Sequence, residues 1–598
     1  MSAGVTGAST DVELSPNADV RLRERYLRRD AGGRVVETPA ELFDRVAGHV
    51  AAAETEYGGD PARWAEEFAA AMRSLVILPS SPVLMNAGTS LGFLSACVVL
   101  PVEDTLHSIF AAVRDMALVH QSGGGTGFSF SRLRPKGDDV HTTHGVASGP
   151  VSFMRIFDVA TDVVRQGGRR RGANMAVLDV SHPDIVEFVT AKSTPGTLQN
   201  FNLSVAVTDA FMYSVEHDGS HSLVNPRTGR TVDTVRARSL MELFAAAAHG
   251  HGDPGLLFLD RINRDNPLPA VGRIEATNPC GEVPLLPDES CTLGSLNLAR
   301  IVRAGRIDWH ALQSYVRLLV RFLDDVVTVN RYPLPLLSDG ALRTRKIGVG
   351  VMGFAELLIL LGIPYDSEEA VLLAGRIASV LQHEAAAESE ALAVVRGPFP
   401  SWPASTFAKR SARPRRNAQL TSIAPTGSIS TIAGTTAGIE PLFALAYSRH
   451  VLGRRLVEID RHFQRAAAER GFGSEALLRD IVARGTVQGD GRVPDDVRRL
   501  FVTALDIAPD WHLRVQAAFQ KCVDEAVSKT VNLPTSSTPE DVLCIFISAW
   551  HASAKGITVY RHGSRPDQVL RIDALADTSV EIDLEYAGGC AASVCEVQ

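Results

Sequence analysis

The sequence predicts an α/β protein with a helical N-terminal region. Short apolar runs such as VILP, SACVVL, GANMAVLDV and FNLSVAV alternate with glycine-rich turns and with longer segments of helical periodicity. Strands that alternate with helices are typical of α/β architectures. At 598 residues, the chain has room for one very large domain with appendages or for two to four ordinary domains.

Four segments are expected along the chain. Residues 1–20 are small and polar, so we expect them to be disordered. Residues 21–75 are predicted to be helical, because apolar residues recur every three or four positions after Pro39. The α/β body is expected to span residues 76–570. Residues 571–598 lack periodicity and are predicted to form a flexible tail.

Two segments of the body are predicted to form amphipathic helices, DTLHSIFAAVRDMALVH (104–120) and SFMRIFDVATDVVRQ (152–166). Each carries apolar residues on one face. Such a face packs either on the protein's own core or on a partner subunit, and the sequence leaves both open.

Composition excludes several function classes. The formal net charge is −8, and dense Lys/Arg runs occur only at 169–171 and 413–416, so we expect no nucleic-acid partner. Small polyphosphate ligands remain open. No signal peptide and no apolar run of about 18–20 residues is present. We therefore expect a cytoplasmic protein without a membrane segment.

The cysteines indicate redox chemistry or buried thiols rather than a disulfide framework. Their number is odd, their spacing is wide and no export signal precedes them. No CxxC, HxxxH or HExxH motif completes a tetrahedral site, so no metal is expected. The seven are Cys97, Cys280, Cys291, Cys522, Cys544, Cys590 and Cys595.

The segment TNPCGE (277–282) places three chemically active side chains at alternate positions. In an extended backbone Asn278, Cys280 and Glu282 project to the same side and converge on one small ligand. The cluster then contains a nucleophile or a radical centre. The same residues also fit a buried apolar thiol beside a solvated carboxylate.

Three glycine-bearing segments are candidate ligand loops. In APTGSIS (424–430), small residues around a glycine let backbone N–H groups face an anion, and a following helix adds about 0.3–1 kcal/mol. An ordinary turn is the alternative. For SGGGTGF (122–128) the alternative is a tight turn, and for QGGRRRGAN (166–174) it is a solvated basic loop.

From about Leu14 to Leu570, these motifs and their order resemble the ribonucleotide reductase family. The resemblance implies a ten-stranded α/β barrel of two five-stranded halves, with Cys280 on a central radical loop. It also implies that Cys280 becomes a thiyl radical that abstracts the 3′-hydrogen of the ribose. Asn278 would then bond the region of the departing 2′-hydroxyl, and Glu282 would act as general base on the 3′-hydroxyl.

The resemblance assigns the remaining thiols. Cys97, in SACVVLPVED, and Cys291 match the pair that supplies two electrons and becomes a disulfide. Cys590 and Cys595 resemble the tail shuttle that thioredoxin or glutaredoxin re-reduces, although an accidental pair of free thiols is the alternative. Cys522 and Cys544 have no counterpart and are expected to be structural.

Substrate and effector residues also follow from the resemblance. The expected substrate contacts are Ser81, Ala96, Gly125, Pro425, Thr426, Gly427, Ser428 and Ile429. The expected contacts to a deoxynucleoside triphosphate or ATP effector are Asp104, Gln121, Gln166 and Arg170. Gln121 stands where many relatives have lysine. The family's effector site implies a homodimer formed through the helices near 104–121 and 150–166.

The radical source is expected to be adenosylcobalamin, as in class II members. Class I large subunits need a tyrosine pair, and none of the nine tyrosines here are adjacent. Class III enzymes carry a glycyl-radical motif and lack the active-site glutamate, whereas Glu282 is present. FQKCVDEAVSKTVNLP resembles class II sequences, although Glu525 replaces their common asparagine. DxHxxG is absent, so no protein histidine is expected on cobalt.

The resemblance implies an oxidoreductase that converts ribonucleoside diphosphates to deoxyribonucleotides for DNA synthesis, with triphosphates as the alternative substrates. A relative that deoxygenates a specialised nucleotide would keep the same cysteines. A catalytically silent nucleotide-binding regulator is disfavoured, because the three active-site cysteines, Asn278 and Glu282 are all intact.

Overall fold

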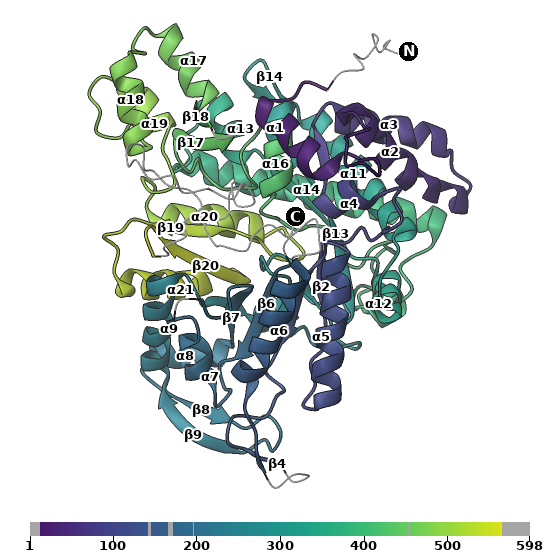
Figure 1. The fold of residues 1–598 in the computed structure, drawn as a ribbon, viewed down its shortest axis with the longest axis vertical. Coiled ribbons are helices and arrows are strands. Elements are labelled where there is room, and N and C mark those ends of the chain that lie inside the picture. The colour runs from purple at the N-terminus through teal and green to yellow at the C-terminus, as the bar shows by residue number, and fades with distance from the viewer. Residues whose placement is uncertain (1–11, 141–144, 166–171, 195, 452–453, 565–598) are drawn as a thin grey trace.

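A computed structural model describes residues 12–564 except 141–144, 166–171, 195 and 452–453. Its central strands pair into a closed ring. Figure 1 shows helices outside these strands and the N-terminal helices at one side.

The N-terminal region is helical, as predicted. Its helices are α1 (Pro16–Arg21), α2 (Pro39–Ala51) and α3 (Pro61–Arg73). Thr38 begins α2 with a capping box, because its hydroxyl accepts Glu41 N–H while Glu41 bonds back to Thr38. Helix α1 begins inside the segment 1–20, so the expected disorder does not hold for Pro16 onward, where Ala18 is buried.

The first half of the barrel is a five-stranded parallel sheet in chain order. Its strands are β2 (Cys97–Val99), β3 (Gly125–Ser129), β6 (Asn174–Asp179), β7 (Phe201–Val207) and β10 (Gly255–Phe258). The helices of this half are α5 (Leu106–Gln121), α6 (Pro150–Arg165), α7 (Ile185–Thr190), α8 (Asp209–Glu216), α9 (Ala237–His251) and α10 (Leu259–Arg264). The hairpin β8 (Ser220–Val224) and β9 (Thr231–Arg236) extends from it.

The second half of the barrel has the same alternation of strands and outer helices, and some of its helices are longer. Its strands are β13 (Glu289–Asn297), β16 (Ile347–Met352), β19 (Thr530–Leu533) and β20 (Gly556–Arg561). Parallel bridges Val349↔Thr421 and Ile423↔Val527 place residues 421–423 between β16 and the start of β19 as the fifth member. The helices are α11 (Trp309–Val329), α12 (Pro335–Thr344), α13 (Phe354–Leu361), α14 (Glu368–Arg396), α15 (Thr406–Lys409), α16 (Gly427–Ala433), α20 (Pro509–Gln520) and α21 (Pro539–His551).

Two antiparallel seams close the ring. Strand β2 runs antiparallel to β13, and β10 runs antiparallel to β20. Strand β1 (Ile77–Pro79) continues the first seam by pairing antiparallel with the far end of β13. The prediction of a ten-stranded barrel built from two five-stranded halves is therefore confirmed.

A small lobe projects from the second half (upper left in Figure 1). It contains β17 (Ala446–Val451), β18 (Arg454–Ile459), α17 (Arg461–Glu469), α18 (Glu475–Arg484) and α19 (Asp495–Leu500). Phe463, Leu477, Ile481 and Phe501 form a core of their own within it. The short pairs β4 (Asp139–Val140) with β5 (Gly145–Val146) and β14 (Val302–Arg303) with β15 (Arg306–Ile307) complete the described strands outside the site.

Candidate active site

The loop that carries Cys280 stands on a two-stranded stem packed against the first half of the barrel. The stem consists of β11 (Ala276–Thr277) and β12 (Pro284–Leu285). A Cβ atom added at Gly127 of β3 would lie 1.8 Å from the Thr277 carbonyl oxygen. Glycine is therefore required in GGGTGF, because the stem backbone occupies the place of a side chain.

Hydrogen bonds fix the shape of this loop. Asn278 Oδ1 accepts the Val283 N–H at 2.9 Å, and the Pro279 carbonyl accepts Asn202 Nδ2 from β7 at 2.8 Å. Gly281 turns the chain with φ +82°, a left-handed conformation that favours glycine. The loop holds Cys280 half-buried at its tip.

Cys97 and Cys291 are direct register partners across the β2–β13 seam. Opposite Cα atoms in an antiparallel pair lie about 4.5–5.5 Å apart, within the range of about 4.4–6.8 Å that a disulfide spans. Both thiols are 0% exposed, and burial raises the pKa of each well above its usual value. Each cysteine is therefore held as a neutral thiol that can become half of a disulfide.

The three cysteines and the predicted base lie together. Asn278 Nδ2 donates to Cys97 Sγ at 3.2 Å, which joins the loop to the thiol pair. After burial, the charge of Glu282 and then that of Cys280 contribute to the raised pKa of Cys97. Glu282 is 0% exposed, and its carbonyl accepts Ser422 Oγ at 3.0 Å and Ala526 N–H at 2.9 Å. All five predicted catalytic residues thus converge.

A charged group that sequence reasoning did not single out lies behind Cys291. Lys346 Nζ bonds Glu289 Oε2 at 2.6 Å, and both side chains are 0% exposed. Cys291 Sγ donates to Glu525 Oε2 at 3.7 Å. Lysine 346 immediately precedes an apolar strand, so nothing in the local pattern indicated that it faces the thiols.

The predicted phosphate loop contacts the N-terminal helices. Thr426, with φ +57°, precedes helix α16, and its Oγ1 accepts Gly438 N–H at 2.7 Å. Arg21 Nη2 of α1 donates to Ser428 Oγ at 3.1 Å. Pro425, Gly427 and Ile429 are buried around them. Arg21 therefore adds a positive charge to this loop, and no local motif indicated this contact.

Ser81 lies in the same region but on another element. It begins α4 (Ser81–Asn86), and its Oγ lies 2.8 Å from Tyr26 Oη. The Ala96 carbonyl accepts Gly125 N–H at 2.9 Å, and Gly125 is the register partner of Cys97. The structure thus places Ala96 and Gly125 beside the reductant thiol, and Ser81 beside Tyr26.

The effector residues are only partly described. Asp104 accepts Arg134 Nε at 2.8 Å and the Arg134 N–H at 3.1 Å, whereas Gln121 is exposed at the end of α5. Gln166 and Arg170 lie outside the described residues. Helices α5 and α6 lie side by side in Figure 1.

The predicted shuttle Cys590 and Cys595 also lie outside the described residues. Cys522 is half-buried and Cys544 is exposed. The described part of the chain contains no cluster of three or more His, Cys, Asp or Glu residues that could hold a metal ion. None of its helices is both long and apolar enough to cross a membrane.

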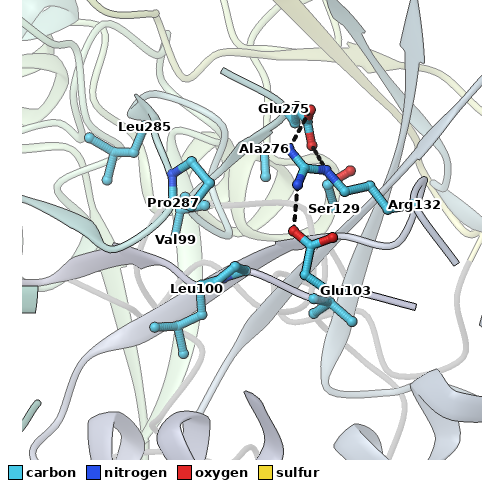
Figure 2. A pocket seen from close by; sticks show the side chains of 11 residues that line it. Val99, Leu100, Glu103, Ser129, Arg132, Glu275, Ala276, Leu285 and Pro287 are labelled. Atoms are coloured by element: carbon cyan, nitrogen blue, oxygen red, sulfur yellow. Dashed lines mark hydrogen bonds and ion pairs between the residues drawn. The ribbon is translucent and has the colours of Figure 1, made fainter. Parts of the chain in front are cut away.

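A separate small pocket opens at the foot of the loop stem. Its walls come from the ends of β2 and β3 and from Ala276 and Leu285 of the stem. Figure 2 shows Arg132 reaching between two carboxylates. It bonds Glu275 at 3.0 and 3.1 Å and also pairs with Glu103. This bridge ties the stem to the strand ends.

Comparison with known protein families identifies the family of this chain. A family model described as "Ribonucleotide reductase, barrel domain" matches residues 95–560, and one described as "Ribonucleotide reductase, all-alpha domain" matches residues 12–92. The chain therefore belongs to the ribonucleotide reductase family.

Two relatives are similar over nearly the whole chain. The chain is 57% identical to the "Vitamin B12-dependent ribonucleoside-diphosphate reductase" of Mycobacterium tuberculosis (strain CDC 1551 / Oshkosh), with 99% of this chain and 85% of that protein covered. It is 44% identical to the protein of the same name from Thermoplasma acidophilum, with 94% and 81% covered. The Actinobacillus ureae class Id ribonucleotide reductase alpha subunit shares the fold, with a TM-score of 0.76, 23% identity, and 92% and 97% coverage.

Proposed function

We propose that this chain is a vitamin B12-dependent oxidoreductase that reduces ribonucleoside diphosphates to 2′-deoxyribonucleoside diphosphates for DNA synthesis. The observation that carries the proposal is the placement of Cys97 opposite Cys291, with the Cys280 loop bonded to Cys97 through Asn278. The names of the relatives with 57% and 44% identity support the diphosphate substrate and the cofactor.

Each catalytic residue has one role. The Cys280 thiyl radical takes the 3′-hydrogen atom and returns it at the end of the turnover, which regenerates the radical. The Glu282 carboxylate takes the 3′-hydroxyl proton and gives it back to the product. Asn278 orients the 2′-hydroxyl region while bonded to Cys97. Cys97 and Cys291 together give two electrons and two protons, the 2′-oxygen leaves as water, and the two sulfurs form a disulfide.

Adenosylcobalamin, when bound, supplies the oxidising equivalent that converts the Cys280 thiol to its radical. The residues present fit this source. Cys280 is half-buried, whereas Cys97 and Cys291 are fully buried, so the radical-carrying thiol is the one that a cofactor can reach. No two tyrosines are adjacent to relay a radical from another protein.

The substrate diphosphate would bind where α16 meets α1. Backbone N–H groups of Gly427 and Ser428 begin α16, and Arg21 adds a positive charge at Ser428. Arginine suits this task because its fork donates more than one hydrogen bond to phosphate oxygens. Ser81 and Tyr26 would line the adjoining surface.

Effector control and dimerisation are further parts of the proposal. Helices α5 and α6 expose the apolar side chains Leu106, Phe110, Val159 and Val163. A second copy of the chain would cover them and bring Asp104 and Gln121 toward Gln166 and Arg170, with a deoxynucleoside triphosphate or ATP between. Light scattering of the effector-bound protein should give a dimer, and a monomer would contradict this part.

Cys590 and Cys595 would carry electrons from thioredoxin or glutaredoxin to the internal disulfide. Free thiols of this kind persist in a reducing compartment, which supports a cytoplasmic location.

The proposal is tested by anaerobic reduction of CDP and ADP with dithiothreitol, with and without adenosylcobalamin. Deoxynucleotide should form only when the cofactor is present. Absence of product with every nucleotide and effector combination would refute the proposed function.

A further inference from the structure

A buried carboxyl group beside Cys291 has no part in the chemistry proposed above. Glu525 lies between α20 and β19 and is 0% exposed, and its Oε2 accepts Cys291 Sγ at 3.7 Å. Its Oε1 has no hydrogen-bond partner among the described residues. Gly348 and Leu293 pack beside it, since a Cβ atom added at Gly348 would lie 2.3 Å from Leu293 Cδ2 and 3.5 Å from Glu525 Oε2. An incompletely bonded buried carboxylate is costly, which favours the protonated form.

Burial outweighs the neighbouring charges and favours the protonated form of Glu525. The groups that face Glu525 are Cys291 on β13, Lys346 before β16, Asp524 beside it in the chain and Glu282 on the radical loop. Burial raises the pKa of Glu525 well above its usual value. The charge of Lys346 and the hydrogen bond from Cys291 oppose this rise, and the charges of Asp524 and Glu282 add to it. Lys346 is already paired with Glu289.

The two sulfurs of the future disulfide therefore differ. Cys97 Sγ accepts a hydrogen bond from the Asn278 amide, which cannot transfer its proton. Cys291 Sγ lies next to a carboxyl group, which can. In thiol–disulfide exchange, the sulfur that is more easily stabilised as it leaves becomes the leaving group.

We propose that Glu525 is the general acid that protonates Cys291 when the Cys97–Cys291 disulfide is reduced, so that Cys97 is the sulfur attacked by the incoming thiolate. This inference rests on the proposed function of the two cysteines. The thiolate of a dithiol bonds to Cys97 Sγ, the S–S bond breaks, and Cys291 leaves with the electron pair and takes the Glu525 proton.

The second thiolate of the same dithiol then displaces Cys97, which leaves as a thiolate. The dithiol has lost two electrons and two protons. Cys97 takes one proton from solvent and Glu525 recovers the other, so both cysteines end as thiols and the carboxyl group is restored.

The first test uses the wild-type enzyme and so does not depend on a variant that folds. Oxidised protein is treated with the monothiol 2-mercaptoethanol, quenched with N-ethylmaleimide and mapped by peptide mass spectrometry. The mixed disulfide should lie on Cys97 and the maleimide on Cys291. The reverse distribution would overturn the proposal.

The second test compares Glu525→Gln with Glu525→Asp and the neighbouring control Asp524→Asn. Reduction of the oxidised enzyme by dithiothreitol should slow about 100-fold in Glu525→Gln. Aspartate should restore part of the rate. Asp524→Asn should react like wild type at neutral pH, with its fall in rate moved to lower pH, because this variant removes a charge that raises the pKa of Glu525. After correction for thiolate concentration, the wild-type rate should fall as rising pH deprotonates Glu525, and this fall should disappear in Glu525→Gln.

The pre-reduced enzyme separates this proposal from the function on which it rests. Pre-reduced Glu525→Gln should still form deoxynucleotide in a single turnover, because the acid is needed only for re-reduction. Reduction of Glu525→Gln at the wild-type rate with the wild-type pH profile would overturn the role of Glu525. A wild-type enzyme that forms no deoxynucleotide would refute the proposed function instead.

Discussion

The two halves of the barrel each contribute one reductant thiol, but they surround it differently. In the first half, Cys97 on β2 has a neutral amide as its partner. In the second half, Cys291 on β13 lies beside Glu525 and near the Lys346–Glu289 pair. Burial raises the pKa of both thiols, so burial does not distinguish them. The two thiols differ in their neighbours: the Glu525 carboxyl group beside Cys291 can exchange a proton, whereas the Asn278 amide beside Cys97 cannot.

The halves also differ in how they use glycine. In the first half, Gly127 admits the stem of the radical loop, since an added Cβ would lie 1.8 Å from the Thr277 oxygen. In the second half, Gly350 admits a neighbouring barrel segment, since a Cβ there would lie 2.4 Å from the Ser422 oxygen. Gly127 therefore helps to position the radical loop, whereas Gly350 allows neighbouring strands of the barrel to approach each other.

The largest expected effect comes from removing the Cys280 thiol, which lies beside the reductant thiols of both halves. Cys280→Ala should abolish turnover, because neither reductant thiol lies on the radical loop in its place. Nucleotide binding, measured by equilibrium dialysis, should remain. Any deoxynucleotide formed above the cofactor-free background would contradict the assignment of Cys280.

Alanine at the two glycines should separate positioning from packing. Gly127→Ala and Gly350→Ala should each destabilise the protein by about 1–3 kcal/mol through overpacking, seen as a lower thermal midpoint. Gly127→Ala should in addition lower turnover per folded enzyme by about 100-fold, because it displaces the radical loop.

Gly375→Ala is the matched control, because this glycine lies in α14 with no atom within 4 Å of an added Cβ. It should raise stability by about 0.4–1 kcal/mol. Equal turnover in Gly127→Ala and Gly350→Ala would show that the loop stem does not depend on Gly127.

A buried histidine gives the first half a pH dependence. Burial lowers the pKa of His120 to about 4, and its Nε2 lies 3.1 Å from Thr126 Oγ1 on β3. An unfolded histidine titrates near 6.5, so between pH 6.5 and pH 4 the unfolded chain binds the additional proton and stability falls as pH falls.

From pH 6.5 to pH 5, this single group should remove about 2 kcal/mol of stability. His120→Asn should make the decline of urea-unfolding free energy over this range shallower by that amount. Identical slopes in the two proteins would show that His120 is protonated in the folded state.

The smallest expected effect concerns the bridge between the strand ends and the loop stem. Arg132 is 47% exposed where it pairs with Glu103 and Glu275. Arg132→Ala should cost no more than about 1 kcal/mol, because exposed ion pairs contribute little. A larger shift of the thermal midpoint would indicate that the bridge holds the stem in place.

Much of this arrangement could be predicted from the sequence. The alternation of strands and helices indicated the α/β class, and the motif resemblance indicated the ten-stranded barrel and the five residues that converge around Cys97. The helical lobe at residues 446–500 was not predicted as a separate part, because its apolar periodicity looks like that of any helix packed on the main core.

Contacts between distant segments account for what could not be predicted. Arg21 and Tyr26 belong to the N-terminal helices, yet they meet Ser428 and Ser81. Glu525 was visible only as a departure from a common asparagine, and its place in the barrel depends on the segment at residues 421–423, where the Thr421 carbonyl accepts the Glu525 N–H. Local sequence patterns carry no information on these contacts, because the contacts form only when distant segments come together as the barrel closes.

The most direct test of the account is to map the disulfide formed during a single turnover. Pre-reduced Cys590→Ser/Cys595→Ser enzyme, which lacks the tail thiols that would re-reduce the pair, receives CDP and adenosylcobalamin without added reductant, and is then quenched in acid, alkylated and digested. We expect one Cys97–Cys291 disulfide for each deoxynucleotide formed. Deoxynucleotide formed while both cysteines remain alkylated as thiols would contradict it.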